Sequence, residues 1–261
     1  QRMGHEVWDV PTVLWDHHPG FGRPSGLVPT GQEMAALLAD FRTPELAART
    51  KVVLSGYCAA HGQIDRVRDH ILALRADGHR PLYCCDPICG DAAGPYVLPE
   101  VLDGLRAGLV PLADVLTPNR HELGFLSGLS VESNAQIVRA ARALGRPLCL
   151  VTSAFGSADD QIANLLVSPH QAWICETSRV ANAPNGTGDL MTALFAGWLA
   201  HGIEAEMAMV RAVASVRAVL EATDLSSREL AVVSAQDEFM RTDRSMRAWQ
   251  LEHGDDRRQE V

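Results

Sequence analysis

The chain has 261 residues, of which 47% are hydrophobic, 5% aromatic and 21% charged, and its formal net charge at pH 7 is −9. This composition is typical of a globular protein, and a chain of this length can bury a large core as one α/β domain. The acidic balance provides no basic footprint for nucleic acid or for an anionic membrane surface. No apolar run reaches the ~18 residues that a membrane-spanning helix needs.

The six cysteines form no Cys-x-x-Cys pair, and most of them lie in or beside apolar runs that are typical of strands. They are Cys58, Cys84, Cys85, Cys89, Cys149 and Cys175. Adjacent residues of a strand point to opposite faces, which disfavours a metal site built from Cys84, Cys85 and Cys89. We therefore expect buried, reduced thiols and a cytoplasmic protein.

The N-terminal quarter of the chain predicts one strand, one loop and one helix. Residues 6–13 (EVWDVPTV) predict a strand, and residues 15–28, rich in Gly, Pro and His, predict a loop. Thr30 and Glu33 form a capping-box pattern, which predicts a helix over residues 30–41.

Short apolar runs then alternate with segments of helical periodicity. The predicted strands are residues 51–54, 81–85, 113–116 and 148–151. The predicted helices carry Ile64, Val67, Ile71 and Leu74 at helical spacing, or span residues 135–144. The strands are continuous apolar runs, which is typical of a parallel sheet covered on both faces.

The C-terminal part predicts an antiparallel strand pair at one edge of the sheet, over residues 162–167 and 172–175, and then two helices over 187–201 and 204–221. The charged tail after Arg241 is expected to be peripheral. The predicted fold class is therefore α/β, a three-layer sandwich with a mostly parallel central sheet and helices on both faces.

Polar residues follow four of the predicted strands. They are Ser55-Gly56-Tyr57, Asp86-Pro87, Thr117-Pro118-Asn119 with Glu122, and Thr152-Ser153. Open parallel sheets bind ligands at the carboxyl ends of their strands. One polar strand end is unremarkable, but four at the same edge indicate a ligand site.

The most specific motif is residues 185–189 (NGTGD), which runs directly into a predicted helix. Glycines let the backbone turn tightly, and the first amides of a helix form an anion hole that suits a phosphoryl group. Asp189, in the first turn, could accept the proton of an attacking hydroxyl. The alternative is an acidic residue favoured only by the helix dipole. The motif is neither a Walker A loop nor a dinucleotide-binding fingerprint.

Residues 186–189 (GTGD) resemble the signature of ribokinase-like kinases, and other segments resemble those of pyridoxal kinases in particular. These segments are 53–57 (VLSGY), 85–91 (CDPICGD), 117–122 (TPNRHE), 151–153 (VTS), Arg228-Glu229-Leu230 and 235–237 (AQD). The resemblance covers nearly the whole chain in order. It implies a single ribokinase-like kinase domain over residues 1–261, which phosphorylates the 5′-hydroxymethyl group of pyridoxal with ATP in vitamin B6 salvage.

The resemblance also implies a role for each site residue. Asp189 is the expected base, with Gly186, Thr187 and Gly188 as anion-hole amides. Asp86 and Glu122 are expected to hold Mg²⁺, and Thr117 and Thr152 to contact the ATP phosphates. Tyr57, His18 and Pro19 are expected at the substrate, Tyr57 on its ring and the other two in a lid. A homodimer is implied as well, and a requirement for K⁺ is left open.

Each of these residues also has a purely structural interpretation. Asp86 before Pro87 could be a turn residue, Glu122 a first-turn helix carboxylate, and Tyr57 a core residue. His17 and His18 could be solvated loop residues. For Asp189, Glu122, Asp86 and His18 the functional interpretation is preferred.

The sequence departs from the family at its start and in the lid. The family's opening strand and Gly/Asn-rich turn have no counterpart before Gln1, so we expect the given sequence to be incomplete. In the lid, Asp16-His17 and Pro19 replace the family's Ser-Asn and Thr, which leaves substrate preference open.

Two other functions are therefore considered. One is a related kinase for hydroxymethylpyrimidine or another small alcohol, although the former would more often have Cys at position 189. The other is a non-catalytic B6-binding protein, against which the joint presence of Asp86, Glu122 and Asp189 argues.

Overall fold

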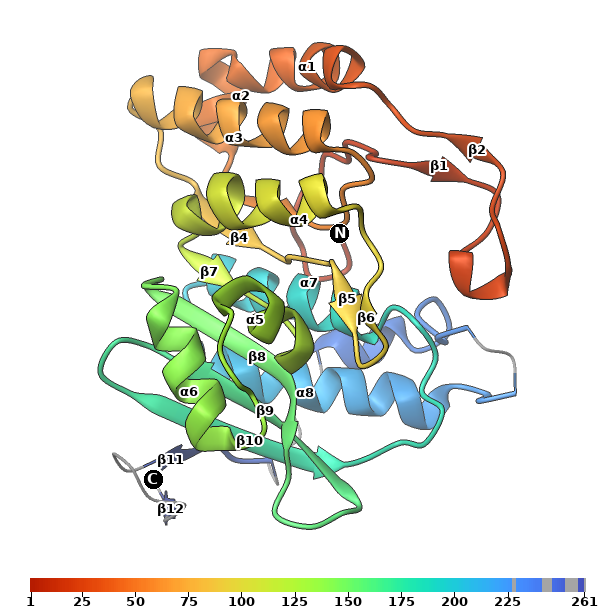
Figure 1. The fold of residues 1–261 in the computed structure, drawn as a ribbon, viewed down its shortest axis with the longest axis vertical. Coiled ribbons are helices and arrows are strands. Elements are labelled where there is room, and N and C mark those ends of the chain that lie inside the picture. The colour runs from red at the N-terminus through yellow and green to blue at the C-terminus, as the bar shows by residue number, and fades with distance from the viewer. Residues whose placement is uncertain (227–228, 241–245, 252–257, 261) are drawn as a thin grey trace.

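An eight-stranded sheet forms the centre of the molecule, with helices on both of its faces (Figure 1). The structure is a computed structural model, and it describes residues 1–226, 229–240, 246–251 and 258–260. The strand order is β12-β11-β10-β9-β8-β7-β4-β3. These strands are β3 (Val52–Ser55), β4 (Leu82–Cys85), β7 (Val115–Leu116), β8 (Leu148–Phe155), β9 (Gln161–Val167), β10 (Ala172–Ser178), β11 (Trp249–Leu251) and β12 (Arg258–Glu260).

The prediction of a mostly parallel sheet is confirmed by strand direction. Strands β3, β4, β7 and β8 pair in parallel, whereas β9, β10, β11 and β12 each pair antiparallel to the strand before them. Because every second antiparallel pairing restores the original direction, β10 and β12 run with β8. Six of the eight described strands, β3, β4, β7, β8, β10 and β12, therefore point the same way.

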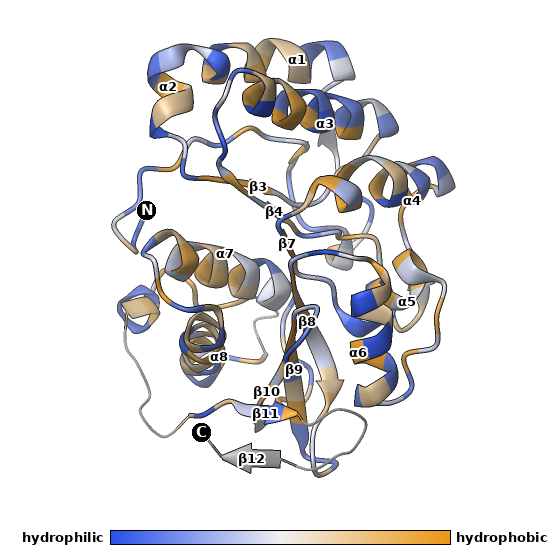
Figure 2. Cartoon of the chain, turned by 90° about the vertical axis from the view of Figure 1, so that its left-hand side faces the viewer, coloured by the Kyte–Doolittle hydropathy of each residue, from blue (hydrophilic) through white to orange (hydrophobic). Residues whose placement is uncertain are grey.

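Two apolar cores separate the sheet from its two helical layers. The layer on one face consists of α3 (His61–Ala76), α4 (Pro99–Gly104), α5 (Arg120–Ser127) and α6 (Asn134–Ala143). The layer on the other face consists of α7 (Thr187–Ala200) and α8 (Ala205–Ala222), and Figure 2 shows the sheet between the two layers. Cys84 belongs to the α7–α8 core and Cys85 to the opposite core, as the alternation of side chains along a strand requires.

Shorter elements complete the fold. The remaining helices are α1 (Gly31–Ala39) and α2 (Pro44–Arg49), with single turns at Pro19–Phe21, Asp40–Arg42, Leu105–Leu109, Val110–Leu112 and Gln236–Met240. Two small hairpins pair β1 (Leu14–Trp15) with β2 (Gly26–Leu27), and β5 (Gly90–Asp91) with β6 (Gly94–Pro95). The predicted helices are confirmed, with ends that differ by one or two residues. Within the described part of the chain, no helix is both long and apolar enough to cross a bilayer.

The prediction of buried, reduced cysteines is confirmed. All six are buried and none forms a disulfide. Burial raises the pKa of the Cys58 thiol to about 12, and that of Cys149 likewise to about 12. Thiols with such pKa values stay protonated at neutral pH, so they act as small core residues rather than as nucleophiles.

The predicted strand over residues 6–13 is wrong. These residues belong to no strand, because no neighbouring strand is present to accept their backbone hydrogen bonds. Side chains bond the segment instead: Gln63 Nε2 donates to Thr12 O at 2.7 Å, and Thr12 Oγ1 donates to Tyr57 O at 2.7 Å. The composition favoured a strand, but the segment is only partly buried, with Val7 41% exposed, and it pairs with no strand.

The predicted loop over residues 15–28 contains more structure than expected. Its ends form the β1–β2 hairpin, in which Leu14 pairs with Leu27 and Trp15 with Gly26. Gly26 has φ +150°, and a Cβ there would lie 2.0 Å from Leu14 O. Only glycine lets the two short strands approach so closely, and this was not visible from the composition.

The C-terminal tail extends the sheet, which corrects the prediction that residues 162–175 lie at its edge. Strands β9 and β10 are antiparallel neighbours, as predicted, but β11 pairs with β10 and β12 with β11. Arg228 and Arg241, used in the sequence analysis, lie outside the described residues.

Candidate active site

The polar ends of four parallel strands lie together, as the sequence predicts. Backbone hydrogen bonds connect them in register: Asp86 N donates to Ser55 O at 2.8 Å, and Thr117 N donates to Cys85 O at 3.1 Å. Thr152 N donates to Pro118 O at 3.0 Å. The carboxyl ends of β3, β4, β7 and β8 therefore form one continuous edge at which a ligand can contact several strands.

Helix α7 begins beside this edge with an open N-terminus. Gly186 precedes it with φ +93°, and the first backbone hydrogen bond runs from Leu190 N to Gly186 O. No side chain caps α7, whereas Thr30 caps α1 and Asn119 caps α5 through capping boxes. The first amides of α7 remain available to an anion, and the helix dipole favours negative charge there.

The two glycines of the motif differ in what requires them. At Gly186 the left-handed backbone requires glycine, because a side chain at positive φ is strained. Gly188 has no positive φ, and a Cβ built there would meet nothing within 4 Å. The fold therefore has no need of glycine at position 188, and the open space above it suits the close approach of a ligand.

Asp86 and Thr117 lie in a buried polar network with a residue of α7. Thr192 Oγ1 donates to Asp86 Oδ2 at 2.8 Å and lies 2.9 Å from Thr117 Oγ1. Burial raises the pKa of Asp86 well above its ordinary range, and the negative charge of Glu122 raises it further. The hydrogen bonds from Thr192 and Thr117 act in the opposite direction. Asp86 is thus a desolvated carboxylate that would gain from a bound cation.

Glu122 both caps a helix and faces the site. Its two carboxylate oxygens accept from Asn119 N at 2.8 Å and from Cys89 N at 3.1 Å. Burial raises the pKa of Glu122 from 4.5 to about 7, against the effect of its backbone hydrogen bonds, and the charge of Asp189 adds to the increase. The structural interpretation of Glu122 as a first-turn carboxylate is therefore correct, but the group is also buried beside a second acidic side chain, which an ordinary exposed first-turn carboxylate is not.

Three carboxylates converge at this point. Asp189 is exposed in the first turn of α7, and its charge raises the pKa of both Asp86 and Glu122. Within the described residues, no group of three or more His, Cys, Asp or Glu side chains could hold a metal ion by itself. This donor set fits Mg²⁺, which takes one or two carboxylates and completes its octahedron with water and phosphate oxygens.

The raised pKa of Glu122 predicts how stability depends on pH. Between about 4.5 and about 7, the folded ligand-free protein holds a proton that the unfolded chain releases. The contribution of Glu122 to the free energy of unfolding is therefore complete below about pH 4.5 and is lost as the pH rises through about 7. We expect Glu122→Gln, which can still form the capping box, to remove this contribution.

Chemical denaturation of wild type and E122Q from pH 5 to pH 8.5 measures the effect. The difference in unfolding free energy between the two proteins should shift in favour of E122Q as the pH rises. A difference that does not change with pH would show that Glu122 keeps an ordinary pKa.

The lid residues lie over the start of α7. His18 Nδ1 accepts from Gly20 N at 3.0 Å and lies 3.4 Å from Asn185 Nδ2, so the lid contacts the residue before Gly186. Pro19 follows as the first residue of the single helical turn Pro19–Phe21. His18 is exposed, as the structural interpretation expected, but it is not isolated from the site.

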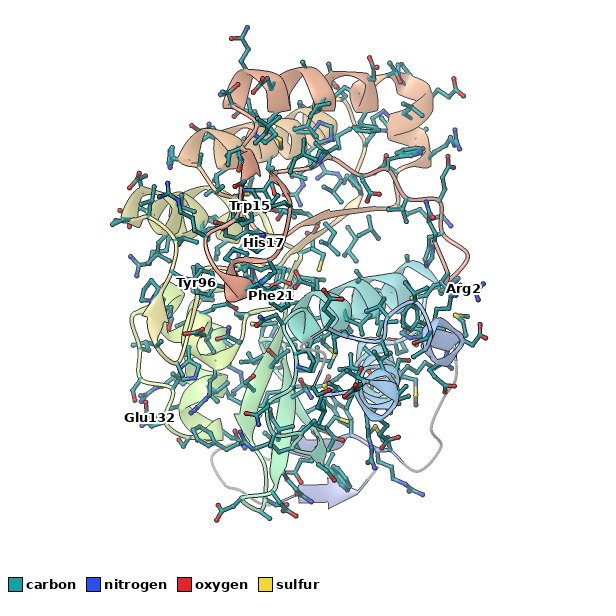
Figure 3. The ribbon with its side chains drawn as sticks, turned by 90° about the vertical axis from the view of Figure 1, so that its right-hand side faces the viewer. Arg2, Trp15, His17, Phe21, Tyr96 and Glu132 are labelled. Carbon is teal, nitrogen blue, oxygen red and sulfur yellow. The ribbon has the colours of Figure 1, made fainter. Side chains whose placement is uncertain are left out.

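Several aromatic side chains of the lid and of the loop after β6 lie on the same side of the molecule. Tyr57 packs at an angle on Trp15, with ring centroids 5.7 Å apart, and is partly buried. In Figure 3, Trp15, His17 and Phe21 of the lid lie on the same side of the molecule as Tyr96, which follows β6. Burial, and then the charge of Glu122, raises the pKa of the Tyr96 phenol.

Thr152 lies where β8 departs from regular pairing. The register between β8 and β9 shifts between Val151 and Ala154, and Ser153 adopts φ +59°. Thr152 forms an isolated parallel bridge with Asn119, the residue that caps α5. This irregularity brings the half-buried Thr152 beside the ends of the neighbouring strands and next to Thr117-Pro118-Asn119.

Two residues of the site were not identified from the sequence: Thr192 and Tyr96. Thr192 is the polar residue within the apolar run 190–196 (LMTALFA), which was a signal that could have been used. Tyr96 lies in a loop, and nothing in its local sequence indicates that it approaches the carboxylates. Asn185 belongs to the motif over residues 185–189, but its contact with His18 was not predicted.

Comparisons with known proteins show which family the chain is similar to. The family model described as phosphomethylpyrimidine kinase matches residues 60–232, which is more than half of the chain. The chain is 36% identical over 244 residues to a pyridoxal kinase PdxY of Leifsonia xyli, with 91% of this chain and 86% of the relative covered. It is 35% identical over 254 residues to a pyridoxal kinase PdxY of Deinococcus radiodurans, with 92% and 85% covered.

Solved structures support the same fold. A pyridoxal kinase from Leishmania donovani, in complex with ADP and pyridoxamine, has a TM-score of 0.87 at 24% identity and covers 96% of this chain and 91% of its own. A putative phosphomethylpyrimidine kinase from Bacteroides thetaiotaomicron has a TM-score of 0.83 at 22% identity, with 96% and 89% covered.

The open helix N-terminus and the acidic strand ends fit a small-molecule kinase, and the family model that matches most of the chain is that of a kinase. The sequence identities of 36% and 35% to the curated relatives show which kinase family this is. The chain belongs to the pyridoxal kinase family.

Proposed function

We propose that this chain transfers the γ-phosphoryl group of ATP to the 5′-hydroxymethyl group of pyridoxal. The observation that carries the proposal is the uncapped N-terminus of α7, which bears Asp189 and faces the buried carboxylates Asp86 and Glu122. The curated relatives named pyridoxal kinase support the acceptor. A solved relative that contains ADP and pyridoxamine supports the pairing of a nucleotide with a B6 vitamer.

Asp189 is proposed as the general base. Its carboxylate is exposed beside the free amides of Gly186, Thr187 and Gly188, so a hydroxyl bonded to it can attack a phosphoryl group bound by those amides. In phosphoryl transfer, most of the catalysis comes from such positioning and from charge stabilisation.

Asp86 and Glu122 are proposed to hold Mg²⁺, which when bound neutralises charge on the phosphates. Both oxygens of Glu122 already accept backbone hydrogen bonds, which favours contact through water for that residue. Thr152 lies at the strand edge, where it is proposed to contact the ATP phosphates. Thr117 is proposed to do the same, although its buried hydroxyl lies against Thr192.

The substrate ring is proposed to bind between Tyr57 and the lid. Tyr57 is half-buried against Trp15, and His18 with Pro19 lies above the start of α7. Closure of this lid would exclude water, which otherwise competes with the substrate hydroxyl for the phosphoryl group. The buried, unpaired cysteines favour a cytoplasmic location. The family resemblance favours one kinase domain and a homodimer.

Substitution of Gly188 by Ala should separate folding from activity. A Cβ at position 188 meets nothing within 4 Å, so the melting temperature should stay near that of wild type. The methyl group occupies the space above the amides, and displacing a phosphate there by about 1 Å should lower kcat/KM by about 10²-fold. Gly186→Ala should instead lose about 1–2 kcal/mol of stability, because its φ is +93°. Wild-type activity in G188A would show that the amides at the start of α7 do not bind the transferred phosphoryl group.

The acceptor is tested by measuring ADP release with pyridoxal, pyridoxine, pyridoxamine, hydroxymethylpyrimidine and ribose. The proposal predicts the highest kcat/KM with a B6 vitamer. The family model described as phosphomethylpyrimidine kinase favours hydroxymethylpyrimidine as the second candidate. A preference for that substrate would retain the mechanism and change the acceptor, whereas ADP release with no acceptor would contradict both.

A further inference from the structure

The hydroxyl of Thr192 makes an unusual contact for a helical threonine. Thr192 is only 2% exposed, on the face of α7 that packs against the sheet, among the apolar side chains of Met191, Leu194 and Phe195. A buried hydroxyl needs a hydrogen-bond partner, and in a helix the nearest one is the carbonyl four residues earlier. Thr192 bonds instead to Asp86, at the end of β4.

Hydroxyl residues at the C-terminal ends of three helices take the local partner, whereas the buried Ser215 of α8 donates to Phe239 O at 3.3 Å. Thr50 donates to Leu46 O at 2.8 Å, Thr223 to Val219 O at 2.6 Å, and Ser127 to Leu123 O at 2.7 Å. Each of these acceptors lies four residues earlier in the chain. The contact of Thr192 with Asp86 is therefore not the arrangement that a helix imposes on a threonine, but one that depends on the packing of α7 against β4 and β7.

The contact restrains the remaining freedom of Asp86. Its backbone is held by the bond from Asp86 N to Ser55 O at 2.8 Å and by the proline that follows, which restricts the preceding residue. The two side-chain dihedrals are left, and the 2.8 Å bond from Thr192 Oγ1 to Oδ2 restrains both. Because Thr192 is buried and its hydroxyl lies within hydrogen-bond distance of both Asp86 and Thr117, its side chain has little freedom to move.

Thr192 also connects two groups of the site. It lies three residues after Asp189 on α7, and residues at this spacing share one side of a helix. Its hydroxyl is within 2.9 Å of Thr117 Oγ1, at the end of β7. One side chain thus ties the helix that carries Asp189 to the ends of two strands.

We propose that Thr192 is a positioning residue, whose hydroxyl holds the Asp86 carboxylate in the orientation that receives the cation and the phosphates of the nucleotide. This inference rests on the proposed kinase function. Partners that orient a metal ligand typically change metal affinity or activity by about 10- to 100-fold when they are removed.

Binding of Mn²⁺, as a spectroscopic substitute for Mg²⁺, tests the inference without turnover. The free Mn²⁺ signal is titrated by electron paramagnetic resonance with the whole chain and ADP. Thr192→Val exchanges only the hydroxyl for a methyl, and we expect it to raise the Kd of Mn²⁺ by about 10- to 100-fold. Thr192→Ser keeps the hydroxyl and should restore binding. Thr50→Val makes the same exchange at the threonine that follows the last residue of α2, outside the proposed site, and should leave the Kd unchanged.

Other roles for Thr192 predict different results. If it only supports packing, T192V should lower the melting temperature while its Mn²⁺ affinity stays at the wild-type value, and that result would overturn the inference. Should T192V fail to fold, Thr192→Ala and Thr192→Ser form a pair that differs by one hydroxyl, and their Kd values should still separate.

The titration also distinguishes this inference from the choice of acceptor. A wild-type protein that binds Mn²⁺ with ADP but phosphorylates no B6 vitamer would contradict the proposed acceptor and leave the role of Thr192 intact. A wild-type protein that binds no Mn²⁺ in the presence of ADP would overturn both the proposed kinase function and the role of Thr192, because Asp86 would then bind no cation.

Discussion

Asp189→Ala is expected to lower kcat by about 10²- to 10⁴-fold, the range over which a positioned general base contributes. The Kd of ATP should change little, because the amides of the α7 N-terminus and the buried Asp86 remain in place. The loss should therefore appear in kcat and not in nucleotide binding. Asp189→Asn should have a similar effect, since its amide cannot accept a proton from the substrate hydroxyl.

A matched control separates catalysis from the helix dipole. Glu45 is an exposed first-turn carboxylate of α2, far from the site in the fold. Glu45→Ala and Asp189→Ala should each lose a helix-dipole interaction of about 0.3–1 kcal/mol, and only the second should lose turnover. Steady-state kinetics and thermal denaturation of the three proteins measure both effects. If D189A retained wild-type kcat, Asp189 would be no more than a favourable first-turn residue.

Asp86→Asn is expected to lower Mg²⁺-dependent turnover by about 10- to 100-fold and, at the same time, to stabilise the ligand-free protein. Asn has the same shape and can still accept from Thr192, but it contributes no negative charge to a cation. Because burial raises the pKa of Asp86 well above its ordinary range, ionising it in the folded protein is unfavourable. The cost develops as the pH rises above the unfolded-state pKa of an aspartate, and removing the group abolishes it.

The gain in stability and the loss of function should appear in the same protein. Melting temperatures at pH 8 without ligand, and Mg²⁺ titrations of activity, measure them. Asp103→Asn, at a side chain that is 73% exposed, is the control and should change neither quantity. An Asp86→Asn protein that melted below wild type would contradict the raised pKa, and one with wild-type Mg²⁺ dependence would remove Asp86 from the cation site.

Elements that are buried on both sides could be predicted from the sequence. The continuous apolar runs at β3, β4, β7 and β8 predicted parallel strands, because strands covered by helices on both faces need apolar residues throughout. The β1–β2 hairpin and strands β11 and β12 could not be predicted in this way. They are two or three residues long, and such strands form only where a partner is supplied by the rest of the fold.

The segment over residues 6–13 shows the opposite case, in which a predicted strand does not form because the fold supplies no partner. Its composition favours a strand, but strand formation requires a neighbour with free backbone groups. In the structure, Thr12 O accepts from Gln63 Nε2, and Thr12 Oγ1 donates to Tyr57 O. Local composition can favour a strand, whereas pairing depends on contacts between distant parts of the chain.

The candidate site divides in a similar way. The sequence predicted three site residues, Asp86, Glu122 and Asp189. Each lies at a strand end or a helix start, where the local sequence indicates both the element and its direction. The role of Thr192 could not be predicted from the sequence, because its hydrogen-bond partner depends on how α7 packs against β4 and β7. The lid contact between His18 and Asn185 spans 167 positions of sequence and has no local signal either.

Transfer to a labelled hydroxyl tests the central claim most directly. Pyridoxal that carries ¹⁸O in its 5′-hydroxyl is incubated with the protein, ATP and Mg²⁺, and the product is analysed by mass spectrometry and ³¹P NMR. If the hydroxyl beside Asp189 attacks the γ-phosphorus, the product is the 5′-phosphate ester, with ¹⁸O retained in the bridge between carbon and phosphorus. Release of ADP and inorganic phosphate without any ester would show that the acidic edge of the sheet directs no phosphoryl transfer to this alcohol.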